Sequence, residues 1–200
     1  SGQTGSTVTL SGVLSNATNA TASLTKTGLG TLILNGANTF SGGVMINAGT
    51  LQAGNASALG TGTVKIDGGQ LNVASGVTLN QTALEIVLSD KYKSDSGVAA
   101  ITGSGSITLN GNKITLSKGE LDSLTTVTEM TFKIADASIS SSFTKDNFTL
   151  DNSWGGWIVS NYDTSNGVIT LSVPEPSMFG LLAGLGALTL VGARRRHKTK

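Results

Sequence analysis

Residues 22–79 read ASLTKTGLGTLILNGANTFSGGVMINAGTLQAGNASALGTGTVKIDGGQLNVASGVTL, and this stretch decides the fold because it nearly repeats itself. The pair Val44-x-Ile46 returns 20 positions on as Val64-x-Ile66. A period of about 20 residues, made of short alternating strands and Gly or Asn corners, is typical of a β-solenoid. One such unit cannot bury its own apolar face, so it has to stack on its neighbours. The stretch therefore predicts roughly three coils of a β-helix.

The residue types of this stretch support the same prediction. Apolar residues alternate with Thr, Asn, Lys and Gly, and a period of two places one face of each strand inside and the other in water. The corners contain Gly, Asn and Asp, which tolerate the positive φ of a sharp turn. Asparagines could also stack as amide ladders between coils: Asn35, Asn38, Asn47, Asn55 and Asn72. An antiparallel sandwich with Gly-rich turns is the alternative, but sandwiches rarely keep a constant offset.

Four motifs within residues 24–60 follow one another in the order LTKTGLGTL, NGANTFSGG, NAGTL and NASALG. Together they resemble the autotransporter-associated β-strand repeat. The resemblance implies the exported β-helical passenger of a bacterial surface protein, with a structural or adhesive role and no catalytic residues. We therefore expect an all-β body, a β-solenoid like a right-handed β-helix.

Composition excludes nucleic acid as a partner. The 200 residues carry a net charge of +1, but five of the thirteen basic side chains lie in residues 194–200. The rest of the chain holds eight Lys against twelve acidic residues, so its body has no basic patch for phosphates.

The chain has few residues of the types that catalyse reactions or bind metals. The chain has no Cys, and its one His, His197, lies in the basic tail. We therefore expect no enzyme activity, no metal site and no cofactor. Glu120 and Asp122 are the one close carboxylate pair worth weighing: on a strand they would lie about 7 Å apart, within the span of an inverting glycosidase pair. No His, Arg or cleft signal accompanies them, which favours a solvated turn.

The two tryptophans of the chain lie close together, in the sequence Trp154-Gly-Gly-Trp157. Exposed tryptophans can stack on sugar rings, whereas aromatics near the end of a β domain more often close its core, and we favour the second interpretation. Next come two alternating runs that flank Asn166-Gly167, a strong hairpin signal. We expect this hairpin, over residues 157–173, to be the last folded element.

The middle of the chain gives weaker predictions. Residues 90–96 form a charged loop, whose spacing does not match a calcium loop, and a solvated turn is expected. Residues 103–111 and 113–116 predict a hairpin, and residues 117–131 predict a short helix. These predictions divide the chain into a solenoid region at 1–89, a C-terminal β region at 90–173 and a tail at 174–200.

The tail has three parts. Pro174-Glu175-Pro176 is held extended because proline fixes φ and disfavours a helix before it. Residues 178–193 carry no charge, and as a helix they would span about 24 Å of a hydrocarbon core near 30 Å. The basic cluster that follows contains Arg194, Arg195 and Arg196. An apolar run with a basic end predicts one short transmembrane helix, marginal but adequate as a temporary anchor.

This order of Pro-Glu-Pro, apolar span and Arg cluster resembles the PEP-CTERM protein-sorting domain. The resemblance implies that the tail holds an exported protein at the inner membrane until a membrane-embedded exosortase recognises Pro174, Glu175 and Pro176 and cleaves nearby. Arg194, Arg195 and Arg196 would be the stop-transfer cluster. The body would then reach the envelope surface or the extracellular matrix. A plain tail anchor is the alternative, but it has no reason to keep the Pro-Glu-Pro.

The sequence as a whole predicts an exported, non-enzymatic surface or matrix protein. Since an exported protein needs a signal, we expect a longer passenger to precede Ser1. A carbohydrate-binding module that contacts exopolysaccharide or surface glycans through Trp154 and Trp157 is the second function class. A β-helical polysaccharide-degrading enzyme that uses Glu120 and Asp122 is the third.

Overall fold

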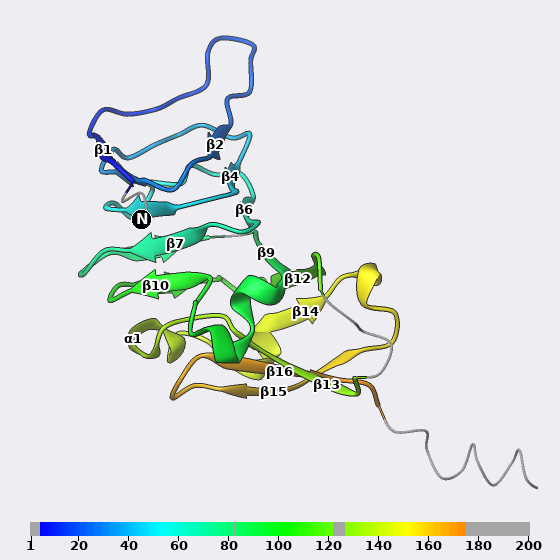
Figure 1. The fold of residues 1–200 in the computed structure, drawn as a ribbon. Coiled ribbons are helices and arrows are strands. Elements are labelled where there is room, and N and C mark those ends of the chain that lie inside the picture. The colour runs from blue at the N-terminus through cyan, green and yellow to red at the C-terminus, as the bar shows by residue number, and fades with distance from the viewer. Residues whose placement is uncertain (1–4, 82, 122–126, 175–200) are drawn as a thin grey trace, which may run out of the picture.

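The computed structural model describes residues 5–81, 83–121 and 127–174. These residues form an all-β fold with mostly parallel sheets, which is compatible with the predicted solenoid. Within these ranges the chain contains sixteen short strands, one α-helical turn, α1 (Ala137–Ser140), and four 3-10 turns. Figure 1 shows the strands stacked one above another from the N-terminal end downward.

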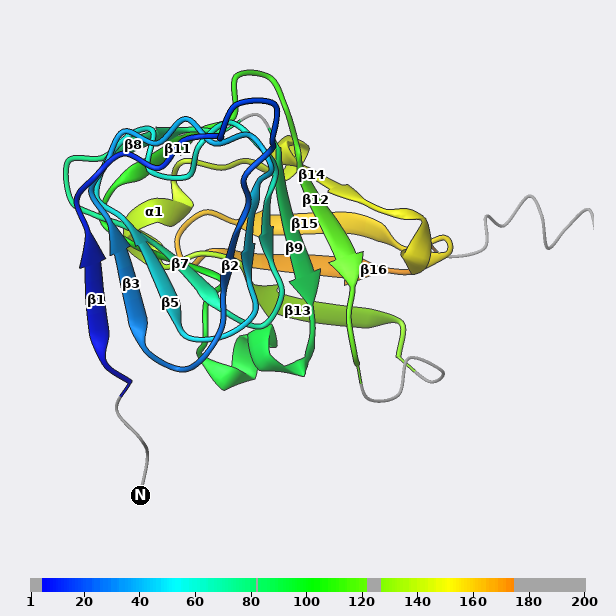
Figure 2. The same cartoon turned by 90° about the horizontal axis from the view of Figure 1, so that it is seen from above.

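Two parallel sheets make up the stack, and the chain passes from one to the other as it advances. The first sheet contains β1 (Thr7–Leu10), β3 (Thr31–Leu34), β5 (Thr50–Ala53), β7 (Gln70–Val73) and β10 (Ile101–Gly103), in that order. The second contains β2 (Leu24–Lys26), β4 (Val44–Ile46), β6 (Val64–Ile66), β9 (Leu84–Leu88), β12 (Ile114–Lys118) and β14 (Phe148–Leu150). Viewed from above, the successive turns superpose, with β8 (Thr78–Asn80) and its parallel partner β11 (Ser106–Thr108) on a third side (Figure 2).

The register confirms the repeat read from the sequence. Val44 pairs with Val64 and Ile46 with Ile66, each 20 positions on along the chain. Leu51 pairs with Leu71 in the other sheet. The inward residues of these strands are fully buried, so each coil covers the apolar face that the previous coil cannot cover alone.

Parallel pairing continues beyond residue 89, where the sequence pattern placed a division. The hairpin predicted over residues 103–116 is wrong, because β10, β11 and β12 each pair in parallel with an earlier strand: β7, β8 and β9. These segments are a further coil. Its offset of 30 residues from β9 to β12 hides the repeat, since the loop after β9 is lengthened by two 3-10 turns, Asp90–Tyr92 and Ser94–Ser96.

The helix predicted over residues 117–131 is also wrong at both of its ends, and its middle, residues 122–126, lies outside the described residues. Its start belongs to β12, and its end belongs to β13 (Glu129–Lys133). In β13 the inward residues Met130 and Phe132 alternate with more exposed ones, which is the period of a strand. The pairing of β13 with β16 (Val168–Ser172) favours a strand over a helix for these residues.

An antiparallel sheet closes the C-terminal end of the stack. It contains β13, β16 and β15 (Ile158–Asp163) in the order β13-β16-β15. The hairpin predicted around Asn166-Gly167 is confirmed by the pairing of β15 with β16. The sheet joins the coils through the parallel bridge between Ile101 and Ala135.

No helix in the part of the chain that the structure describes is long and apolar enough to cross a membrane. The transmembrane helix predicted over residues 178–193 lies outside the described residues.

Candidate functional site

The described chain ends at the start of the predicted sorting motif. β16 ends at Ser172, and the N–H of the next residue, Val173, donates to the carbonyl of Thr128 at 3.0 Å. Pro174 follows and is exposed. The other motif residues, Glu175 and Pro176, lie outside the described residues, as does the cluster of Arg194, Arg195 and Arg196. The motif therefore begins in an exposed segment directly after the last strand of the body.

The two predicted glycan-contact residues lie in an aromatic cluster at the C-terminal end of the stack. Trp154 is only 4% exposed, its Nε1 donates to the carbonyl of Leu116 at 2.9 Å, and its ring meets Phe132 edge-on at 6.3 Å. Trp157 is half-buried, with its ring 6.1 Å from that of Trp154. The Trp154 ring thus has packing and hydrogen-bond partners within the body and offers no open face for stacking on a sugar.

The carboxylate pair is not brought together within the described residues. Glu120 is exposed just after β12, and Asp122 lies outside the description. In residues 5–81, 83–121 and 127–174, no three His, Cys, Asp or Glu side chains gather as metal ligands would.

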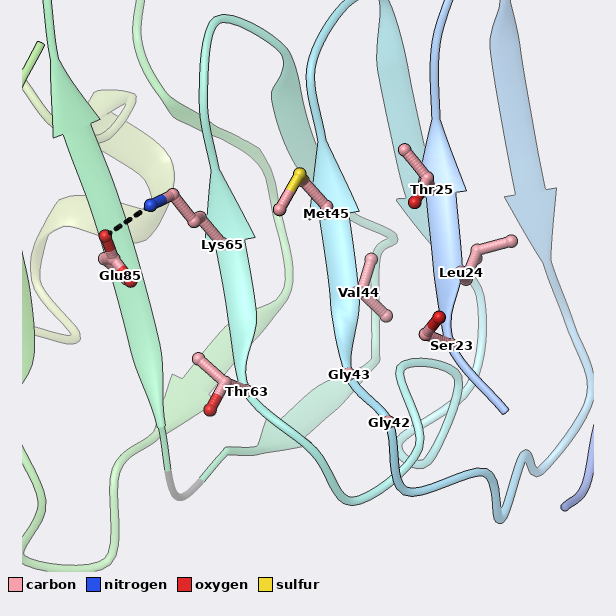
Figure 3. Close-up of a pocket in the computed structure, with 10 residues that line it drawn as sticks. All are labelled: Ser23, Leu24, Thr25, Gly42, Gly43, Val44, Met45, Thr63, Lys65 and Glu85. Carbon is pink, nitrogen blue, oxygen red and sulfur yellow. Dashed lines mark ion pairs between the residues drawn. The ribbon is translucent and has the colours of Figure 1, made fainter. Parts of the chain in front are cut away.

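A row of side chains crosses the outer face of the second sheet and contains an ion pair. Register places Met45 opposite Lys65, and Lys65 opposite Glu85, on neighbouring strands. The Lys65 Nζ lies 2.8 Å from the Glu85 Oε1, which also accepts a hydrogen bond from the Ser117 hydroxyl at 2.8 Å (Figure 3). The hydrogen bond to Glu85 is the main cause that raises the pKa of Lys65, so Lys65 stays charged at neutral pH.

A depression of about 300 Å³ lies beside this row. Figure 3 shows it along β2, β4, β6 and β9, with Ser23, Leu24 and Thr25 on one side and the ion pair on the other. Lys65 and Glu85 neutralise each other, and the other described side chains that line the depression are Ser, Thr, Leu, Val and Met. The Glu85 carboxylate that accepts from the Ser117 hydroxyl is held in an ion pair by Lys65 through the same oxygen, so it is not a free base.

Two buried polar residues hold the coils together. Lys26 is 7% exposed, and its Nζ donates to the carbonyls of Thr27, Gly28 and Ala48 at 3.0, 2.6 and 3.1 Å. Burial lowers its pKa. The sequence gives no signal of this role, because Lys26 is a lone lysine flanked by threonines. Asn38, proposed from the sequence as an amide-ladder residue, instead bonds main-chain groups of two other segments: it accepts from Leu14 N at 2.8 Å and donates to Ala58 O at 2.6 Å.

Comparison with known proteins agrees with both sequence resemblances. The model of the passenger-associated-transport-repeat matches residues 24–53, which include β2 to β5. The model of the PEP-CTERM protein-sorting motif matches residues 172–196. This chain therefore contains an autotransporter-associated repeat and a PEP-CTERM sorting motif.

A curated relative supports the first of these findings. The chain is 38% identical over 125 residues to the adhesin BmaC autotransporter of Brucella suis biovar 1 (strain 1330). The match covers 56% of this chain but 4% of the adhesin, so the chain corresponds to a small part of that protein's length. No solved structure matches the chain.

Proposed function

We propose that the chain is the β-helical body and sorting tail of an exported bacterial surface or matrix protein, held at the inner membrane and then processed by an exosortase-type enzyme. The observation that carries this proposal is the position of the sorting motif. Its match begins at residue 172, at the end of the last strand, and its Pro-Glu-Pro starts at the exposed Pro174. A protease would need this exposure, because the segment around the cleaved peptide bond must be accessible and extended to enter an active site.

The tail would anchor the body only for a time. A helix over residues 178–193 would span about 24 Å, which is short for a hydrocarbon core near 30 Å. Arg194 to Arg196 would stay on the cytoplasmic side and snorkel to the interface. Cleavage near Pro176 would separate the body from both parts.

The released body would serve a structural or adhesive role as a right-handed solenoid. The repeat, and the identity to a protein named as an adhesin, support this role. We expect a non-enzymatic protein, because the Glu85 carboxylate beside the Ser117 hydroxyl is held in an ion pair by Lys65. Contact with exopolysaccharide or surface glycans is the second candidate function, and Trp157 rather than the buried Trp154 would be the residue of that pair to contribute.

Intact mass of the protein recovered from producing cells tests the sorting step. We expect the wild type in the envelope or medium to lack the segment beyond about Pro176, and Glu175→Ala to keep it and collect in the inner-membrane fraction. Ser177→Ala, next to the motif, is the matched control and should be processed as the wild type is. Retention of Arg194 to Lys200 in the wild-type protein would instead identify a permanent tail anchor.

A further inference from the structure

The third side of the coil stack contains a cavity of about 330 Å³, which none of the residues of the aromatic cluster lines. Three successive coils line it, through residues 37–39, 56–61 and 80–81. Small-molecule sites in proteins start at about this size. The segments that form the cavity are fixed by main-chain bonds between coils, including Asn38 N to Ser57 O at 3.1 Å and Gln81 N to Thr108 O at 3.1 Å. The cavity is therefore preformed.

Amides and hydroxyls supply its polar groups. Asn38 and Gln81 are each 2% exposed, and the hydroxyl residues Ser57 and Thr61 lie exposed at the rim, with Asn80 beside them. None of the described residues that line the cavity is charged. A site of this kind can both donate to and accept from hydroxyl groups, but it has no counter-ion for an anion or a cation.

Gln81 gives the second, independent indication of a ligand. A buried amide normally has hydrogen-bond partners. The Asn38 amide is satisfied by Leu14 N and Ala58 O. By contrast, within the part of the chain that the structure describes, the Gln81 amide forms no side-chain hydrogen bond, and its polar atoms are open to the cavity that it lines rather than enclosed. A ligand in the cavity can therefore bond them.

We propose that this cavity binds one ring of a neutral sugar, with the Gln81 amide bonding a ring hydroxyl. Neutral sugars match the uncharged lining, and the rim hydroxyls of Ser57 and Thr61 would bond further hydroxyl groups. Sugar binding goes beyond the proposed structural role and does not depend on the sorting tail. A negative result for sugar binding would therefore not affect the proposed sorting step, and a negative result for sorting would not affect sugar binding.

Titration of the isotope-labelled 200-residue chain, followed by amide NMR, tests the proposal. The probes are the methyl glycosides of glucose, galactose, mannose and N-acetylglucosamine, with glucuronate as the charged comparison. We expect saturable shifts in the Gln81 side-chain amide and in the backbone amides of Ser57 and Thr61 with at least one neutral sugar. Gln81→Met should weaken that sugar's affinity by about tenfold or more, as expected for a lost buried hydrogen bond.

Gln52→Met is the matched control, because Gln52 is a half-buried glutamine of β5 outside the cavity, and it should leave affinity unchanged. If Gln81→Met does not fold, Thr61→Val at the exposed rim takes its place and should also weaken binding. The absence of saturable shifts with every neutral sugar, equal binding by the wild type and both cavity variants, or preference for glucuronate would each overturn the proposal.

Discussion

The side-chain Nδ2 of Asn38 donates to the main-chain carbonyl of Ala58, 2.6 Å away on the next coil. The Oδ1 of the same amide accepts from Leu14 N on the coil before. One buried side chain therefore links three consecutive coils through their main chains, at corners where no strand pairing is available to satisfy those groups.

Replacing Asn38 with Leu keeps the number and branching of the side-chain heavy atoms and leaves both main-chain groups without this partner. Each buried unsatisfied group costs about 1–3 kcal/mol, so we expect Asn38→Leu to lower the free energy of unfolding by about 2–6 kcal/mol. Urea unfolding followed by circular dichroism measures the change. Asn161→Leu, at an exposed position of β15, is the control and should change stability by less than about 0.5 kcal/mol.

Lys26 should prove a structural residue despite its charge. Lys26→Met keeps the aliphatic stem but removes the donor to the carbonyls of Thr27, Gly28 and Ala48. Relief of the buried charge offsets part of the loss, and we expect a net destabilisation of about 1–3 kcal/mol in denaturant unfolding. Lys113→Met replaces an exposed lysine and is the comparison. Equal stability of the two variants would contradict a structural role for the Lys26 ammonium.

Gly49 should tolerate substitution less well than Gly28, although both have positive φ. A Cβ at Gly49 would lie 2.4 Å from the carbonyl oxygen of Gly30, whereas a Cβ at Gly28 would meet nothing within 4 Å. Gly28→Ala therefore carries only the backbone cost of about 1–2 kcal/mol. Gly49→Ala adds a clash with main chain, and we expect it to cost about 2 kcal/mol more or to prevent folding. Thermal melts of the two variants, side by side, decide this.

The Lys65–Glu85 pair gives a pH-dependent prediction. Because the folded-state pKa of Lys65 is raised, its stabilisation is fully present below the ordinary lysine value of 10.5 and is lost as pH rises through the folded-state pKa. Lys65→Met should therefore be less stable than wild type by about 0.2–1 kcal/mol at pH 7, and the difference should shrink above about pH 10.5 and in high salt. A difference that stays constant to pH 12 would exclude ionisation of Lys65 as its cause. Lys26 titrates in both proteins, so its own contribution cancels.

The local predictions that succeeded share one property. The 20-residue offset from Val44 to Val64 places like residues in register because each coil buries its apolar side chains against the coil before. The Asn166-Gly167 hairpin likewise needs only a turn that suits two adjacent strands. In both cases the residues that decide the structure are near neighbours or exact repeats in the sequence.

Predictions failed where the partner of a segment is distant and the spacing irregular. Residues 103–116 have the alternation and the glycines of a hairpin, yet β12 pairs with β9 on one side and with β14 on the other. Alternation predicts a strand but does not say with which strand it pairs. The 34 residues that separate Ile114 from its partner Phe148 contain β13 and α1, so no constant period remains to reveal the pairing.

The sequence by itself determined the all-β class, the coil repeat of residues 22–79, the final hairpin and the sorting motif. Each of these features depends on residues that are adjacent in the chain or that recur at a constant spacing. Only the tertiary structure decided that parallel coils continue past residue 89, that Trp154 is buried, and that Lys26, Asn38 and Gln81 are enclosed between coils. A side chain's burial depends on the coil stacked beyond it, and that coil is set by chain segments 20 to 34 residues away.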